Sequence, residues 1–207
     1  TQSGIDLKED KRVIDTITDI AEFIPMEKGQ KLTAPQLLER FLFSRKQQQV
    51  YVSQLSGRER RRLYLLTVLM RNPNFLILDE PVSSLDVSVR ATILNLLLEL
   101  QEKLGLTYLY ISHDLSSVRF ISTRVAVMYL GRIVELSDVD SLFEHPLHHY
   151  TFALMSAIPV PDPSGKQVLS ILEGEVPSVM NPPPGCRFQF RCPLAGAQCR
   201  DREPPLT

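Results

Sequence analysis

The sequence predicts an α/β fold with a mainly parallel sheet, followed by an irregular tail. Residues Phe75–Leu78 are all apolar and run into the acidic pair Asp79 and Glu80, a pattern typical of a strand buried on both faces of a parallel sheet. Helical and strand-like patterns alternate around this run, which indicates crossover helices. We therefore expect one domain over residues 1–158, and a tail rich in Pro, Gly and Ser over residues 159–207.

Two helices are expected in the polar first part of the chain. Apolar residues recur at helical spacing over residues 10–22, which predicts an amphipathic helix. Thr33 can cap a second helix that continues to about Phe43, with Pro35 in its first turn.

The middle of the chain carries the clearest periodic patterns. A third helix is expected to begin at Ser56 and to end near Asn72, before the strand at 75–79. The next helix covers residues 89–104 and stops at Gly105.

Two further strands belong to the predicted domain. Residues 107–112 are rich in β-forming side chains, and residues 125–129 form another strand before a turn that begins at Gly131. We assign no regular element after residue 158.

Bulk composition is that of an ordinary soluble protein. The 207 residues are 43% hydrophobic and 23% charged, with a net charge of −1. The charge gives no general attraction to nucleic acid. No apolar run reaches the length of a membrane span, and no signal peptide is visible. We therefore expect a cytosolic chain that can still dock on a membrane protein.

The acidic pair suggests a chemistry. At the carboxyl end of a buried strand, where open α/β sheets bind ligands, Asp79 and Glu80 suit ATP hydrolysis. One carboxylate can hold Mg²⁺, and the other can orient or deprotonate the attacking water. The alternative is a core strand that ends in a solvated acidic turn.

Motifs on both sides of the pair favour the first interpretation. Leu55–Glu59 lies upstream, and Ser83–Asp86 and Ile111–Asp114 lie downstream. In this order they resemble the signature motif, D-loop and H-loop that surround the Walker B strand in ABC ATPases. The resemblance implies a partial P-loop NTPase fold that binds ATP and Mg²⁺. The roles it implies are magnesium binding by Asp79, catalysis by Glu80, a D-loop contact by Asp86, and a γ-phosphate contact by the switch histidine His113.

The signature motif and the phosphate loop depart from the family pattern. By the resemblance, Ser56 and Gly57 face the γ-phosphate bound to the opposite subunit of a dimer, at a helix N-terminus. Arg58 stands where the family has a second glycine. We expect it to obstruct the close backbone approach, although a cation offered to the phosphate is the alternative. No Gly-x-x-x-x-Gly-Lys-[Ser/Thr] loop is present, so the chain is expected to be a fragment that is inactive alone.

The two parts of the chain resemble different ABC branches. Residues 1 to about 80 resemble ribosome-associated ABC-F ATPases, especially over Leu55–Leu78, and in that resemblance Gln2 is the Q-loop glutamine. Residues from about 81 onward resemble the ATP-binding subunits of bacterial dipeptide and oligopeptide importers. The chain therefore has a chimeric appearance, with a seam within residues 76–81.

The importer resemblance implies the function. We expect an ATP-hydrolysing subunit that pairs with a second ATPase subunit and with transmembrane permease subunits, at the inner face of the bacterial membrane. An ABC-F type ribosome factor and an inactive ABC fragment are the alternatives. No direct nucleic-acid contact is expected.

The tail offers candidate metal ligands. Cys186, Cys192 and Cys199 correspond to three of four cysteines that hold a 4Fe–4S cluster in some importer subunits. Such clusters normally need four thiolates, so we favour three free thiols. The importer resemblance implies that the histidines at 145, 148 and 149 lie in a connector into a helix over residues 150–158, rather than in a metal site.

Overall fold

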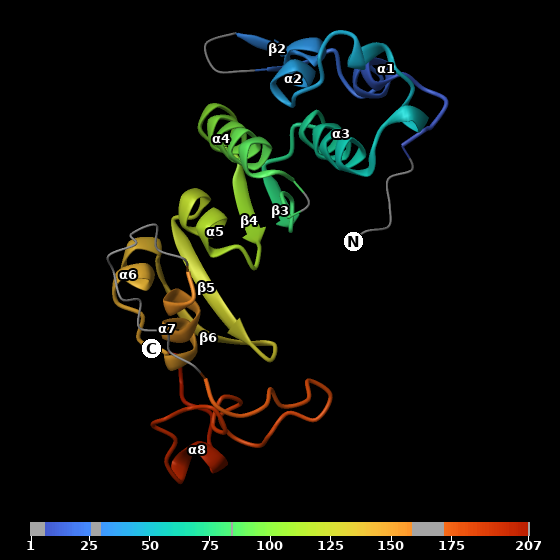
Figure 1. Ribbon diagram of the computed structural model, residues 1–207. Helices are drawn as coiled ribbons and strands as arrows, with labels where there is room; N and C mark the ends of the chain where they lie inside the picture. Colours follow the sequence, from blue (N-terminus) through green and yellow to red (C-terminus); the bar gives the residue numbers. More distant parts are fainter. Residues whose placement is uncertain (1–6, 26–29, 84, 159–171, 207) are drawn as a thin grey trace, which may run out of the picture. The chain divides into compact units, whose positions relative to one another are not determined.

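The structure is a computed structural model in which residues 7–25, 30–83, 85–158 and 172–206 are described (Figure 1). Contacts divide the chain into two units, residues 1–114 and 115–207, and each unit is described by itself. The expected domain boundary at residue 158 marks a change of composition and stays a prediction.

The first unit begins with short elements. They are α1 (Val13–Thr18), β1 (Phe23–Pro25), β2 (Lys31–Thr33), α2 (Ala34–Arg40), and the 3-10 turns η2 (Gln47–Gln49) and η3 (Val52–Gln54). Both predicted helices are present but shorter than expected. Thr33 caps α2 as predicted, and its N–H donates to Gln36 Oε1 at 3.0 Å. The antiparallel pair β1–β2 was not predicted, because strands of three residues are too short to show a period.

The longer elements of this unit agree with the predictions. They are α3 (Gly57–Leu69), β3 (Phe75–Asp79), α4 (Val87–Leu104) and β4 (Thr107–Ile111). Gly105 ends α4 in the left-handed conformation, with φ of 62°. β3 and β4 are parallel and in register from the pair Phe75–Thr107 to the pair Asp79–Ile111.

Helices α1, α2 and α3 enclose a core of large side chains. Its fully buried members include Ile17, Leu37, Phe41, Leu63 and Leu66. This packing holds α3, which carries the signature-like motif at its first turn.

The expectation that Phe75–Leu78 is buried at every position is wrong for the described chain. Leu76 and Leu78 are 5% exposed, whereas Phe75 is 50% and Ile77 is 63% exposed. Helix α4 covers the face that carries Leu76, since Tyr108 on that face donates a hydrogen bond to Leu97 O at 2.9 Å. The described sheet has two strands, and Phe75 and Ile77 lie exposed on its other face.

The second unit contains α5 (Leu115–Ile121), β5 (Arg124–Tyr129), β6 (Arg132–Asp138), α6 (Val139–Glu144), α7 (His149–Ser156) and α8 (Gln198–Asp201). β5 and β6 form an antiparallel hairpin. Leu130 and Gly131 have φ of 46° and 75°, as a two-residue hairpin turn of the primed type requires. The predicted strand at 125–129 and the turn at Gly131 are therefore confirmed.

The mixed α/β class is confirmed, but the mainly parallel sheet is not. Of the three sheets among the described residues, β3–β4 is parallel, and β1–β2 and β5–β6 are antiparallel. The hairpins have short connections, which favour antiparallel pairing. Within the described residues no helix combines the length and apolarity needed to cross a bilayer.

Most of the described tail lacks regular structure, as expected, although α8 was missed. The tail is anchored by Phe188, which is 1% exposed. Its ring lies 5.2 Å from Tyr129 and 5.9 Å from Tyr150, centroid to centroid. This aromatic cluster fixes part of the tail against β5 and α7.

Candidate active site

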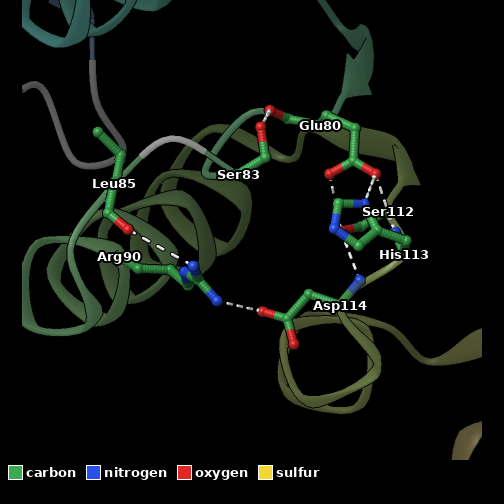
Figure 2. Close-up of polar contacts among 7 residues, drawn as sticks. All are labelled: Glu80, Ser83, Leu85, Arg90, Ser112, His113 and Asp114. Carbon is green, nitrogen blue, oxygen red and sulfur yellow. Dashed lines mark hydrogen bonds and ion pairs between the residues drawn. The ribbon is translucent and has the colours of Figure 1, made fainter.

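Glu80 lies at the point where the two parallel strands end. It follows β3 directly, and its N–H donates to Ile111 O at the end of β4, at 2.9 Å. Its φ of 49° turns the chain out of the strand direction. Because the carboxyl ends of parallel strands meet at one edge, Glu80 lies beside Ser112 and His113 (Figure 2).

The Glu80 carboxylate accepts hydrogen bonds on both oxygens. Ser112 Oγ donates to Oε2 at 3.2 Å, and the His113 N–H donates to Oε1 at 2.9 Å. Nδ1 of the His113 ring also makes a short contact with Oε1. The Glu80 side chain is 32% exposed and the His113 side chain is 81% exposed, so water reaches both groups.

These contacts decide which role Glu80 suits. Partial burial opposes its ionisation, but the hydrogen bonds from His113 and Ser112 outweigh this effect, and the pKa of Glu80 is lowered. A carboxylate with a lowered pKa stays ionised, and so available as a hydrogen-bond acceptor, but it is a weaker base. The arrangement therefore favours orientation of a water molecule over its deprotonation.

Asp79 is the last residue of β3 and is exposed. An exposed carboxylate at a strand end suits Mg²⁺, which keeps several waters and takes only one or two protein carboxylates beside phosphate oxygens. The chemistry of Asp79 and Glu80 thus fits the metal and nucleotide that the sequence predicts.

Ser56 caps helix α3, as its place in the signature-like motif predicts. Its N–H and Oγ both donate to Glu59 Oε2, at 2.9 and 2.6 Å. The pKa of Glu59 is lowered, chiefly by the hydrogen bond from the Ser56 side chain. The Ser56 hydroxyl is thus already bonded in this structure, and a phosphate would have to displace a carboxylate from it. The sequence analysis missed this capping box, although the spacing Ser-x-x-Glu signals it.

The Arg58 side chain has a partner that the sequence analysis missed. Its Nη1 donates to Asp86 Oδ1 at 2.8 Å, and the two side chains are 59% and 67% exposed. Asp86 is the N-cap residue of α4, so the pair joins the starts of α3 and α4. Such exposed pairs contribute only about 0–1 kcal/mol. A Cβ built on Gly57 meets nothing within 4 Å, and the expected obstruction by Arg58 stays a prediction.

The three tail cysteines do not form a metal-binding group with other described residues. The described residues include no group of three His, Cys, Asp or Glu side chains that could share a metal ion. The Cys186 N–H donates to Cys199 O at 2.8 Å, and burial raises the pKa of the Cys186 thiol. The iron–sulfur cluster remains an implication of the resemblance.

The remaining candidates lie elsewhere. Gln2 falls outside the described residues. His148 caps α7, since its Nδ1 accepts from the Tyr150 N–H at 3.1 Å. Its ring centroid lies 5.0 Å from that of Phe188, so its contacts are those of a structural residue.

Comparison with known proteins gives two family matches. Residues 5–83 match the family described as ABC transporter, and residues 134–199 match the family described as oligopeptide/dipeptide transporter, C-terminal region. Two separate parts of the chain thus match families of ABC transport proteins.

Its relatives carry names that refer to peptide transport. It is 56% identical over 156 residues to a probable peptide ABC transporter ATP-binding protein of Sinorhizobium fredii, a match covering 75% of this chain and 44% of that protein. It is 48% identical over 158 residues to a putative oligopeptide transport ATP-binding protein of Bacillus subtilis, covering 75% and 48%. The oligopeptide transport ATP-binding protein OppF of Escherichia coli is also 48% identical, over 75% of this chain and 47% of that protein. The chain thus spans less than half the length of these relatives.

Proposed function

We propose that this chain belongs to the ATP-hydrolysing subunit of a dipeptide or oligopeptide importer. The observation that carries the proposal is the Glu80 carboxylate, held by Ser112 and His113 at the carboxyl ends of two parallel strands. The peptide-transport names of the relatives and the match over residues 134–199 support import over the ABC-F alternative.

Each residue has a role that its position supports. When bound, ATP supplies the γ-phosphate and Mg²⁺ neutralises its charge. Asp79 would hold the metal. Glu80 orients the attacking water, and His113, largely exposed beside it, is placed to donate to a phosphate oxygen. Ser56, Gly57 and Asp86 would face the nucleotide of a second ATPase subunit.

The partners follow from the same proposal. Two ATPase subunits would close on ATP and drive paired permease subunits between conformations, so the protein would work at the inner face of the bacterial membrane. The net charge of −1 gives this chain no general attraction to nucleic acid.

The test is a Glu80→Gln substitution in this chain joined to a segment that carries a phosphate-binding loop, with Arg58 changed to Gly. We expect ATP turnover in the joined protein. Glu80→Gln should lower kcat by about 100-fold or more, because the amide no longer orients and polarises the water as the carboxylate does. ATP binding should be retained.

Glu102→Gln is the matched control, since Glu102 is an exposed carboxylate on α4 and its loss should leave turnover unchanged. Equal turnover in Glu80→Gln and in the unsubstituted protein would show that another group orients the water.

A further inference from the structure

Arg90 joins two loops that reach the candidate active site. It lies in the first turn of α4, and its Nη1 donates to Asp114 Oδ2 at 2.6 Å. Its Nη2 makes a longer contact of 3.4 Å with Leu85 O. One guanidinium therefore contacts the D-loop backbone before α4 and the carboxylate that follows His113 (Figure 2).

A chain of hydrogen bonds connects Asp114, the partner of Arg90, to Glu80. The Asp114 N–H donates to Ser112 Oγ at 3.1 Å, and Ser112 Oγ donates in turn to Glu80 Oε2 at 3.2 Å. The Ser112 hydroxyl therefore accepts a hydrogen bond from Asp114 and donates its own hydrogen to Glu80, as a hydroxyl group can. His113 lies between Ser112 and Asp114, and its backbone N–H also bonds Glu80.

The D-loop reaches Glu80 by a second route. Ser83 Oγ donates to Glu80 O at 3.1 Å, and the Leu85 N–H donates to Val82 O at 3.1 Å. The Leu85 carbonyl that Arg90 contacts thus belongs to a turn that starts at Glu80. Arg90 thus contacts both segments that are hydrogen-bonded to Glu80, the one that contains Leu85 and the one that contains Asp114.

We propose that Arg90 is a positioning residue that fixes the D-loop and the H-loop around Glu80. The proposal rests on the ATPase function proposed above. Arginine suits this place because its planar fork offers separate donors in fixed directions, whereas lysine has one compact ammonium group. The side chains of Arg90 and Asp114 are 28% and 26% exposed, so their ion pair is less screened than the exposed Arg58–Asp86 pair.

The first test is hydrogen exchange in the 207-residue chain. In Arg90→Gln, the amides of His113 and Asp114 should exchange faster, because Asp114 loses the cation that holds it. The amides of α3 should keep their rates. Arg90→Lys should retain part of the protection. Arg71→Gln, at an exposed position, should change nothing near the site.

The second test is ATP turnover in the chain joined to a phosphate-binding loop. Arg90→Gln should lower kcat by about 10- to 100-fold, since a small misplacement of a positioned group has effects of this size, while KM changes little. Asp114→Asn should act similarly, and the double substitution should add little, because both remove one interaction.

The outcomes separate the two proposals. Unchanged exchange at His113 and Asp114 in Arg90→Gln would overturn the positioning role, and so would faster exchange at all amides alike, which would mark a general structural role. If the unsubstituted joined protein does not hydrolyse ATP, the proposed function fails, and the exchange result alone decides whether Arg90 fixes the two loops.

Discussion

His148 shows how one half-buried ring can make stability depend on pH. It caps α7 through Nδ1 and packs against Phe188. Burial lowers its pKa below the ordinary value of 6.5, although the charge of Glu135 acts in the opposite direction. The folded chain therefore prefers the neutral ring, which alone keeps Nδ1 as an acceptor for the Tyr150 N–H.

The sign of the effect follows from proton binding. Below pH 6.5 the unfolded chain binds a proton at His148 that the folded chain does not, so the free energy of unfolding should fall as pH decreases through this range. His148→Asn should reduce this dependence and keep a capping oxygen, whereas loss of the cap altogether costs about 1 kcal/mol. Urea unfolding between pH 7.5 and 5.5, followed by near-UV circular dichroism of the tyrosines, measures it.

His145→Asn is the control, because His145 is exposed and should leave the pH dependence in place. A pH dependence that persists unchanged in His148→Asn would assign it to another group.

At the scale of elements, the β3–β4 sheet has one covered and one open face. Leu76 is 5% exposed and its neighbour Ile77 is 63% exposed. Substitution of these two residues of similar size therefore compares the contribution of each face to stability. Leu76→Ala should lower the free energy of unfolding by about 2–5 kcal/mol, because it leaves a cavity under α4. Ile77→Ala should change it by about 0.5 kcal/mol or less, as surface substitutions do.

Urea unfolding of the two variants makes the comparison. An equally large loss of stability in Ile77→Ala would mean that the open face is covered in solution, for example by a second copy of the chain. Dilution would then identify self-association, since it would lower the stability of the unsubstituted chain.

Helical periodicity allowed the sequence to predict α3 and α4, and apolar or β-forming runs predicted β3 and β4, whereas the strands β1 and β2 and the alternating burial of β3 were not predicted. An apolar run predicts a strand, but whether both faces are covered depends on neighbours that lie elsewhere in the chain. For the candidate active site, the sequence pointed to the acidic pair Asp79 and Glu80 and to His113. The pairs Arg58–Asp86 and Arg90–Asp114 were missed because only the fold brings residues 28 and 24 positions apart into contact.

At the scale of the whole molecule, nucleotide affinity depends on a phosphate cradle as well as on catalytic groups. The sequence contains no Gly-x-x-x-x-Gly-Lys-[Ser/Thr] loop, whose backbone N–H groups and lysine hold the phosphates. At the candidate active site, phosphate groups would meet the carboxylates of Asp79 and Glu80, which supply no positive charge. At the signature-like motif, which would face the nucleotide of a second subunit, the Arg58 guanidinium is bonded to Asp86 and the Ser56 hydroxyl to Glu59.

We expect the 207-residue chain to bind MgATP with a dissociation constant of about 1 mM or weaker, equivalent to about −4 kcal/mol. Isothermal titration calorimetry at physiological ionic strength measures it, and ATP without Mg²⁺ should bind still more weakly, because the carboxylates then repel the phosphates directly. Joining a phosphate-binding loop to the chain should tighten binding, since the amides and lysine of the loop supply the missing donors. A low-micromolar constant for the chain alone, about −8 kcal/mol, would mean that donors other than such a loop hold the phosphates.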